Sequence, residues 1–231
     1  MKPTREGVPS VSATQPRLRA DAQRNRERII AAAREVLVEE GGDFSFDKIA
    51  RRVGVGNATL YRHFADRREL IHHVTLSVMG RIAEQAEAAR AEEPDAFRAL
   101  RRFVHAAAAE RVGALCPQLE GYADHDHPDL VAARGRLEAA VQGLMDAAHT
   151  SGQLRSDIGL GDLMVAITQL TRPLPGKGCP EFDRFVQRHL QLFLDGLMNP
   201  PRSELPGHAV TFDELRRNRQ QAAAGCHTPL P

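Results

Sequence analysis

One short stretch carries side chains whose types and spacing could bind nucleic acid. Residues 57–64 read NATLYRHF, and successive residues of a helix are turned by about 100°. If Leu60 and Phe64 face the core, the remaining side chains form an outward face with a small polar centre and hydrogen-bonding flanks: Ala58, Thr59, Tyr61, Arg62 and His63. A helix that enters the major groove needs a slim centre that reaches base edges and flanking donors that reach phosphates. An ordinary solvated face would favour Glu, Lys and Gln instead.

The residues before this stretch predict a second short helix that would position it. Ser45 is a suitable N-cap, and the apolar residues behind it follow helical spacing: Phe46, Ile49, Ala50 and Val53. Gly54 stands where a left-handed residue usually ends a helix, and Gly56 can act as a weak N-cap for the next one. Two short helices joined by a glycine-containing turn are typical of a helix-turn-helix. The spacing alone also fits an ordinary helical hairpin.

Longer helices are expected on both sides of this pair. A helix from near Gln23 to Glu40 has one apolar stripe and should pack behind the two short helices. Asp66 can cap another helix that runs toward Arg90 without a break. Because it is continuous, this second helix could act as a lever between the first module and the rest of the chain.

The segment from Arg26 to His73 resembles the TetR family of transcriptional regulators. NATLYRHFADRREL is similar to the family's recognition helix and the start of the following helix, and FSFDKIARRVGVG is similar to its second helix and turn. Two departures are mild: Gly56 stands where the family usually has a Ser cap, and Arg67 where it usually has Lys.

The resemblance implies a dimeric DNA-binding regulator with a helical ligand-sensing domain. Thr59 and Arg62 would then meet base edges, with Ala58 permitting close approach of the backbone. The residues expected to hold phosphates are Ser45, Lys48, Tyr61, His63 and Arg67. Asn57 completes the predicted DNA-binding set, although its angle also places it beside the core. The partners expected are a double-stranded operator, a second copy of the chain and an unknown small-molecule effector.

All segments after Pro94 have helical rather than alternating periodicity, so we expect an all-α fold. The expected helices are Asp95 to Arg111, Ala114 to Tyr122, Pro128 to Ser151, Gly161 to Leu170, and Glu181 to Leu197. The last two are apolar on more than one side, which predicts a four-helix interface in a twofold dimer; full burial within one subunit is the alternative. The expected division is an irregular basic arm (1–20), a helix-turn-helix domain (21–72), a sensing and dimerisation domain (73–198) and a mostly irregular tail (199–231).

The effector site is the least determined part. In family members the ligand cavity lies among the helices after the linker, and its walls here would come from Phe97, Phe103, Val104, Leu119, Tyr122, Leu137, Leu144, Met145, Met164 and Arg172. Tyr122 and Arg172 are the polar groups that could orient a hydrophobic or amphipathic molecule. The apolar members also suit an ordinary core. Farther along, Thr211 and Glu214 match a capping box that could start a short tail helix.

A run of four polar residues, Asp124 to His127, leaves a metal site open as an alternative. A helical metal-dependent protein or enzyme could use it, but such a site needs ligands from another element. A polar loop that caps the helix at Pro128 is the preferred interpretation, so no metal or cofactor is assigned. The sequence has none of the GxSxG, GxxxxGK, HExxH or GxGxxG patterns, and we expect no enzyme. A partner-binding module that has lost DNA binding is the remaining alternative.

Composition indicates a cytoplasmic protein. Its 231 residues carry a net charge of +1, yet residues 1–34 hold eight cations and three acids, a local charge of +5 that would attract phosphate. Cys116, Cys179 and Cys226 share no CxxC spacing and are expected to be reduced thiols. No apolar run approaches the roughly 20 residues that cross a bilayer.

Overall fold

The computed structural model describes residues 14–41, 44–120, 126–173, 182–201 and 203–215, and the single positions 122, 124 and 217. Within these residues the chain is all-α, as predicted, and its only extended pairing is an isolated bridge between Leu154 and Met198. The helices are α1 (Thr14–Glu40), α2 (Phe46–Val53), α3 (Asn57–His63), α4 (Arg67–Glu92), α5 (Ala96–Ala109), α6 (Val112–Glu120), α7 (Pro128–Thr150), α8 (Leu160–Leu170) and α9 (Phe182–Leu197).

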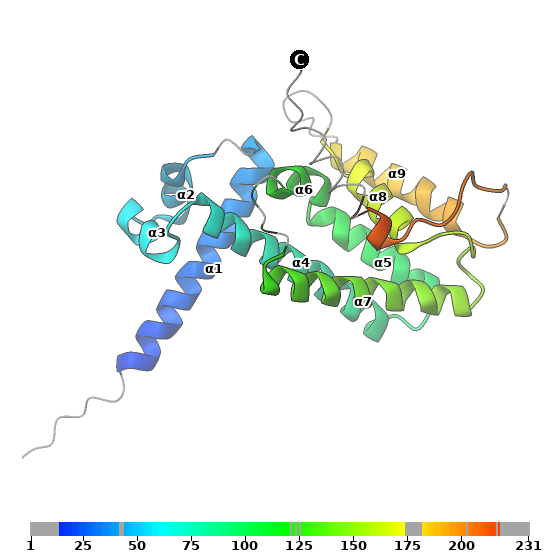
Figure 1. Cartoon of the computed structure of the whole chain (residues 1–231), viewed down its shortest axis with the longest axis horizontal. Coiled ribbons are helices and arrows are strands. Elements are labelled where there is room, and N and C mark those ends of the chain that lie inside the picture. The colour runs from blue at the N-terminus through cyan, green and yellow to red at the C-terminus, as the bar shows by residue number, and fades with distance from the viewer. Residues whose placement is uncertain are drawn as a thin grey trace, which may run out of the picture.

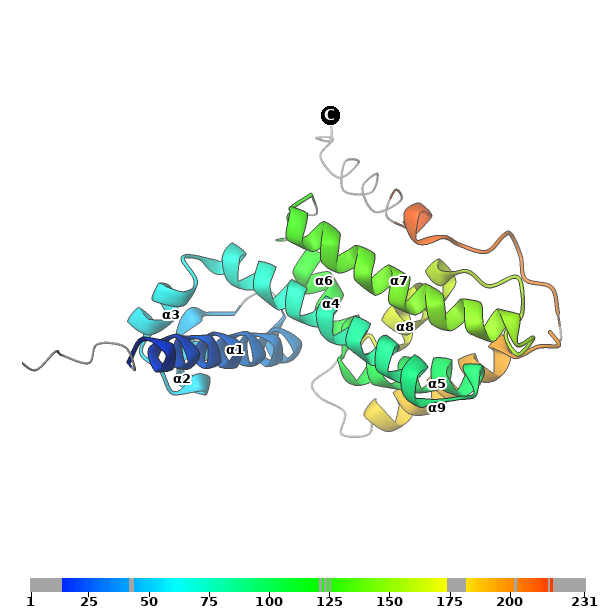
Figure 2. The same ribbon diagram turned by 90° about the horizontal axis from the view of Figure 1, so that it is seen from below.

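The helices form two groups joined by α4. Helices α2 and α3 lie with α1 at one end of the elongated molecule, and α8 and α9 lie toward the other end (Figures 1 and 2). Helix α4 begins directly after α3, passes α1 and then runs beside α5 and α7. The expected continuous link between the two parts of the chain is therefore present. No helix in the described part is both long enough and apolar enough to cross a membrane.

Helix ends lie within about two residues of the predicted ones, except at the start of α1; α6, for example, runs from Val112 rather than Ala114. Ser45 caps α2, Asp66 caps α4 and Asp95 caps α5, each by accepting a hydrogen bond from a backbone N–H in the first turn. Helix α1, however, begins at Thr14 rather than near Gln23. The expected irregular arm is thus wrong for residues 14–20, and residues 1–13 lie outside the described part. The reason is that Pro16 falls in the first helical turn, where its missing N–H costs little.

The first module has a small core between α1, α2 and α3. Ile29, Ile49 and Leu60, one from each helix, are fully buried. Gly54 ends α2 in the left-handed region at φ 75°, and its N–H donates to the carbonyl oxygen of Ala50 at 2.9 Å. The short turn from Gly54 to Gly56 then sets the direction of α3, as the helix-turn-helix prediction required.

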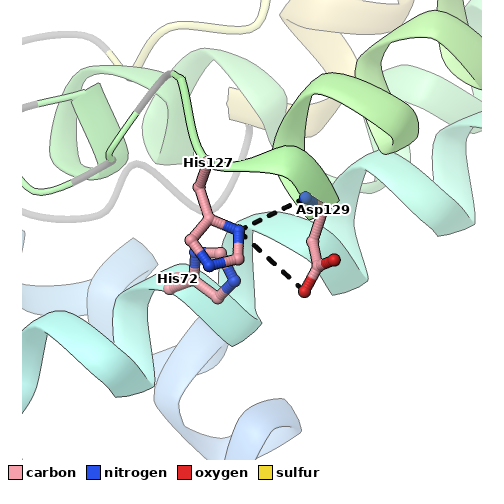
Figure 3. A group of neighbouring side chains, drawn as sticks. All are labelled: His72, His127 and Asp129. Atoms are coloured by element: carbon pink, nitrogen blue, oxygen red, sulfur yellow. Dashed lines mark hydrogen bonds and ion pairs between the residues drawn. The ribbon is translucent and has the colours of Figure 1, made fainter.

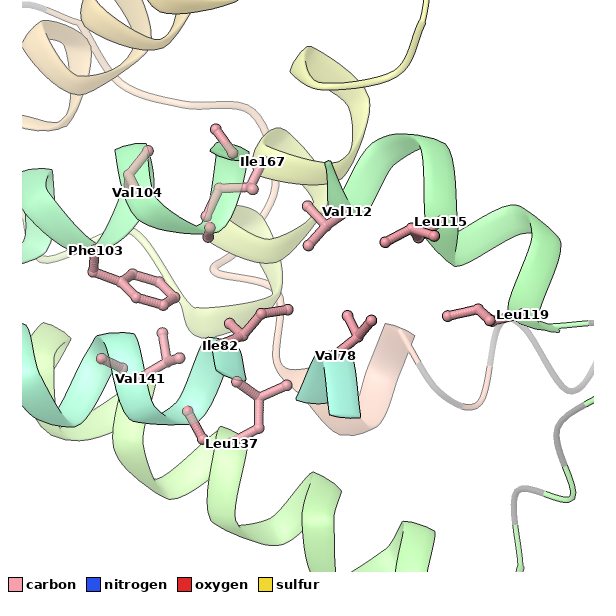
Figure 4. Packing of buried hydrophobic residues seen from close by; sticks show 14 of the residues in the cluster. Val78, Ile82, Phe103, Val104, Val112, Leu115, Leu119, Leu137, Val141 and Ile167 are labelled. Atoms are coloured by element: carbon pink, nitrogen blue, oxygen red, sulfur yellow. The ribbon is translucent and has the colours of Figure 1, made fainter. Parts of the chain in front are cut away.

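The second group of helices shares a larger apolar core. Side chains from α4, α5, α6, α7 and α8 converge in it, among them Val78, Phe103, Leu115, Val141 and Ile167 (Figure 4). All five are at most 4% exposed. The same contiguous cluster includes residues of α1 to α3, so the two groups are packed on each other.

A buried acid also ties the two groups together. Glu110, the C-cap of α5, has only 8% of its side chain exposed and pairs with Arg34 of α1 and with Arg81 of α4. Arg81 donates to both carboxylate oxygens, at 2.6 and 3.0 Å. This hydrogen bonding raises the pKa of Arg81 above its usual value. A carboxylate shared by two guanidinium groups from different helices satisfies most of its acceptor sites.

The tail crosses the start of α8. Gly161 donates its backbone N–H to the carbonyl oxygen of Val210 at 2.7 Å, and a Cβ at Gly161 would lie 2.5 Å from that oxygen, so only glycine fits.

The predicted capping box is confirmed: Glu214 N–H donates to Thr211 Oγ1 at 3.2 Å, and Thr211 N–H donates to Glu214 Oε2 at 2.8 Å. One helical turn follows over residues 212–215. The last fourteen residues, 218–231, are outside the described part.

Candidate nucleic-acid interface

Helix α3 is anchored from beneath by two apolar side chains and one arginine. Leu60 and Phe64 are fully buried, as predicted. The guanidinium carbon of Arg26 lies 4.4 Å from the centre of the Phe64 ring, and its Nη1 donates to the carbonyl oxygen of His63 at 2.7 Å. The last turn of α3 is therefore fixed to α1 by stacking and by a charged hydrogen bond.

The opposite side of α3 is open. We call its five residues the recognition surface: Ala58, Thr59, Tyr61, Arg62 and His63. Ala58 and Arg62 are exposed, and Thr59 and His63 are half-buried. Tyr61 is 56% exposed, and its ring packs at a tilt against that of Phe46 of α2, with ring centres 5.1 Å apart. Within the described part of the chain, the guanidinium of Arg62 has no hydrogen bond or ion pair. The orientation that the helical angle predicted is present.

Three other predicted DNA contacts lie at the N-terminal ends of α2 and α3. Ser45 Oγ accepts the N–H of Lys48 at 3.3 Å, while the Lys48 ammonium pairs with Glu40. Asn57 is exposed and donates to Asp47 of α2, so its placement beside the core is wrong. The reason is that Asn57 is the first residue of α3, and its side chain is directed to Asp47. Contacts of Ser45, Lys48 and Asn57 with DNA stay predictions.

Arg67 takes a different direction from the one its sequence position suggested. Its side chain is half-buried, and its guanidinium lies 4.3 Å from the centre of the Phe44 ring. It donates to the carbonyl oxygen of Phe44 and, at 3.2 Å, to the hydroxyl of Tyr122. We call the group of Arg67, Phe44 and Tyr122 the junction. A phosphate contact by Arg67 stays a prediction.

Several cations of the basic N-terminal segment are also used inside the fold. Arg28 donates to the carbonyl oxygen of Val53 at 2.7 Å, which satisfies an otherwise open end of α2. Arg26 is held at Phe64, and Arg34 is paired with Glu110. The local charge of +5 therefore overstates what this segment can offer to phosphates.

The predicted effector residues divide into a buried set and two polar exceptions. The buried members lie in the shared apolar core: Phe97, Phe103, Val104, Leu119, Leu137, Leu144 and Met145. Met164 is partly buried against it. Arg172 is exposed beyond the C-terminus of α8, so it does not line this core. The hydroxyl of Tyr122 is directed to Arg67. Effector contacts of all these residues, including Tyr122 and Arg172, stay predictions.

The two-sided apolar character of α9 is visible in its burial. Val186, Leu190, Leu194 and Leu197 form the buried side. Phe185 and Leu192 are 43% and 60% exposed, and Val165 of the neighbouring helix α8 is 39% exposed. One subunit thus buries one stripe of α9 and leaves a second apolar set at the surface.

Comparison with known proteins matches both groups of helices. Residues 29–74 match the family model described as bacterial regulatory proteins of the tetR family, and residues 94–199 match the SbtR-like transcriptional regulator C-terminal domain. HTH-type transcriptional regulators of Staphylococcus aureus strains are 43% identical over 58 residues, 25% of this chain. The matched segment spans 31% of the length of those relatives.

Solved structures extend the match over most of the chain. A TetR transcriptional regulator from Streptomyces coelicolor is 32% identical, with a TM-score of 0.59, over 77% of this chain and 99% of that one. PfmR, a TetR family regulator from Thermus thermophilus, shares the fold at 21% identity, with a TM-score of 0.55 over 74% of this chain and 98% of that one. With its helix-turn-helix and its helical second domain both matched, the chain belongs to the TetR family of bacterial transcriptional regulators.

Proposed function

We propose that this protein is a ligand-responsive repressor that binds a palindromic operator as a homodimer in the cytoplasm and leaves it when a small hydrophobic or amphipathic effector binds. The observation that carries the proposal is the recognition surface. Its side chains point away from the side of α3 that Leu60 and Phe64 bury in the core. The guanidinium of Arg62 has no partner in the described part of the chain. The role requires no catalytic step.

Each part of the recognition surface has a distinct role in this proposal. Thr59 and Arg62 read base edges, and a bidentate arginine contact to guanine is the commonest specific contact of this kind. Tyr61 and His63, on the flanks, hold phosphates and set the register of the helix in the groove. Ala58 keeps the centre slim enough for the backbone to approach the bases.

The test of this assignment uses an operator selected from genomic DNA fragments and measured by fluorescence anisotropy. Arg62→Ala should weaken binding by about 1–3 kcal/mol, roughly tenfold to hundredfold, and relax the preference at one base pair. Tyr61→Phe and His63→Ala should weaken binding to all sequences more evenly. Arg98→Ala is the matched control, since Arg98 is exposed on α5, outside the helix-turn-helix. Unchanged affinity and preference in Arg62→Ala would refute the assigned groove face.

Dimerisation is assigned to the exposed apolar set on α8 and α9. Burial of Phe185, Leu192 and Val165 against a second copy would join two helices from each subunit in a four-helix interface. Two recognition helices could then read half-sites spaced by about 34–36 Å, one turn of duplex, or a multiple of it.

A single charged substitution tests that interface. Leu192→Asp should convert the dimer to a monomer at micromolar concentration and lower operator affinity, because a carboxylate would be buried without a partner. Analytical ultracentrifugation checks the oligomeric state. The control is Gln191→Asp, at the neighbouring half-buried position of α9. If the Leu192→Asp protein still sediments as a dimer, the interface lies elsewhere.

Helix α4 is the element through which an effector would act. It starts directly after α3 and packs along α5 and α7 in the second domain. A molecule bound among these helices can shift operator affinity only if it binds the DNA-competent and released states with different affinity. Screening small molecules for operator release, followed by calorimetry on the free protein, identifies the effector.

A further inference from the structure

Three potential metal ligands from two different helices meet beside the start of α4. His72 belongs to the second turn of α4, and His127 and Asp129 lie at the start of α7. One ligand atom from each residue lies within 4.8 Å of the other two. Figure 3 shows the imidazole rings of His72 and His127 next to each other with the Asp129 carboxylate beside them; the ring centres are 4.4 Å apart and the rings meet edge to face at 67°.

Capping of α7 explains only part of this cluster. His127 Nδ1 accepts the backbone N–H of Asp129 at 3.3 Å, and it lies 3.9 Å from Asp129 Oδ2. This arrangement is a helix cap, as the polar run before Pro128 predicted. His72 takes no part in the cap and comes from a helix 55 positions earlier in the chain, and its ring is half-buried against that of His127. The second element that a metal site required is therefore present.

We propose that His72, His127 and Asp129 bind one divalent transition-metal ion. Two imidazole nitrogens and one carboxylate oxygen form a ligand set that suits zinc, cobalt or nickel, whereas magnesium and calcium prefer oxygen ligands alone. Three protein ligands leave at least one position of a tetrahedral ion for water or another small ligand. The exposed side of the cluster provides access, because 42% of the His127 side chain and 65% of the Asp129 side chain are exposed.

Binding requires only a small movement. At metal–ligand distances of about 2.0–2.1 Å, the ligand atoms of a tetrahedral zinc ion lie about 3.4 Å apart. The present limit of 4.8 Å is larger, so the three side chains must close around the ion. Rotation of the exposed His127 and Asp129 side chains can achieve this if His127 gives up the hydrogen bond from Asp129 N–H. The ion then replaces a weak cap with three direct bonds.

The position of the cluster gives the ion a mechanical consequence. It would fasten the second turn of α4, just after the recognition helix, to the first turn of α7 in the second domain. In the proposed function, which this consequence assumes, the bound ion would fix how α3 is held relative to the sensing domain. The binding site itself does not depend on that function.

The test is calorimetry on full-length, tag-free protein that has been treated with a chelator, in the absence of DNA. Zinc and cobalt should each bind at one ion per chain, and magnesium should not compete. His72→Gln, His127→Gln and Asp129→Asn should each lower zinc affinity by roughly tenfold or more, since even indirect partners of a metal ligand contribute about that much. Zinc should also raise the melting temperature of the wild type, and a His72→Gln/His127→Gln protein should lose this shift.

His208→Gln is the matched control, because His208 is an exposed imidazole that pairs with Glu214 and belongs to neither α4 nor α7. Circular dichroism verifies that each variant is folded. The proposal is overturned if zinc binds the double variant as tightly as the wild type, or if the wild type binds no zinc. Because DNA is absent, failure of the metal site and failure of operator binding give separate results.

Discussion

The recognition surface and the junction use the same side-chain type in opposite ways. Arg62 is exposed and has no partner in the described part of the chain, whereas Arg67 is half-buried, stacks on Phe44 and donates to the hydroxyl of Tyr122. Both arginines belong to the same helix-turn-helix segment and both look available in the sequence. The difference is that the fold supplies acceptors for the guanidinium of Arg67 and supplies none, within the described residues, for that of Arg62.

The same contrast applies to the aromatic residues of α3 and its end. Tyr61 keeps 56% of its surface exposed, while Phe64 is fully buried between Arg26 and the ring of His73, whose centre is 5.8 Å away. Tyr61 is thus positioned to contact something outside the chain. Phe64, in contrast, anchors α3 to the core.

Removal of the Phe64 ring should have the largest effect on stability. Phe64→Ala would leave a cavity between α3, α1 and α4 and lower the free energy of unfolding by about 3–5 kcal/mol. Arg62→Ala, on the opposite face of the same helix, should change it by no more than about 0.5 kcal/mol. Chemical denaturation followed by circular dichroism measures both. Equal losses in the two variants would mean that the recognition surface is part of the core.

Substitution of Arg67 tests the difference between the recognition surface and the junction more directly. Arg67→Ala removes charged hydrogen bonds to Phe44 and Tyr122, which are worth more than neutral ones, and should lower the free energy of unfolding by about 1–3 kcal/mol. Arg67→Lys should recover little of this, because an ammonium cannot match the planar guanidinium that stacks on Phe44 and reaches both acceptors. Arg68→Ala, at the exposed neighbouring position, is the control.

The alternative role of Arg67 gives the opposite pattern. If this arginine holds a phosphate, Arg67→Ala should leave the unfolding midpoint unchanged and weaken binding to all DNA sequences, and Arg67→Lys should restore that binding. Denaturation and anisotropy measured on the same three proteins therefore distinguish a junction residue from a DNA contact.

Features set by residues close together in the chain were predictable from the sequence. The caps at Ser45, Asp66 and Asp95 and the box between Thr211 and Glu214 each involve groups three residues apart. The outward orientation of the recognition surface follows from the helical angle about the buried Leu60. Such features depend on local geometry, which spacing encodes directly.

Features set by residues far apart carried no comparable signal. The pairing of Arg67 with Tyr122 and the meeting of His72 with His127 each span 55 positions, and spacing cannot encode such a contact. Arg172 was proposed to line an effector cavity; the structure places it at the surface beyond the end of α8, and its contact with an effector stays a prediction. The start of α1 was placed too late because Pro16 is compatible with a first helical turn.

The smallest expected effect is a pH dependence of stability that comes from His73. Burial lowers the pKa of this imidazole, and the nearby charges of Arg26 and His72 lower it further, against the opposing influence of Glu69 and Asp129. The unfolded chain therefore binds the proton more readily than the folded one. Stability should be fully present above the ordinary value of 6.5 and should decrease as the pH falls below it.

The variant His73→Gln isolates the contribution of this buried imidazole to the pH dependence of stability. The variant should show a shallower loss of unfolding free energy between pH 7.5 and about 5.5 than the wild type, because the proton-binding difference of one imidazole is gone. Denaturant titrations at several pH values measure the slope. An unchanged slope in His73→Gln would mean that burial beside Phe64 does not lower the pKa of this imidazole. The buried side of α3 would then accommodate a charged imidazole without loss of stability.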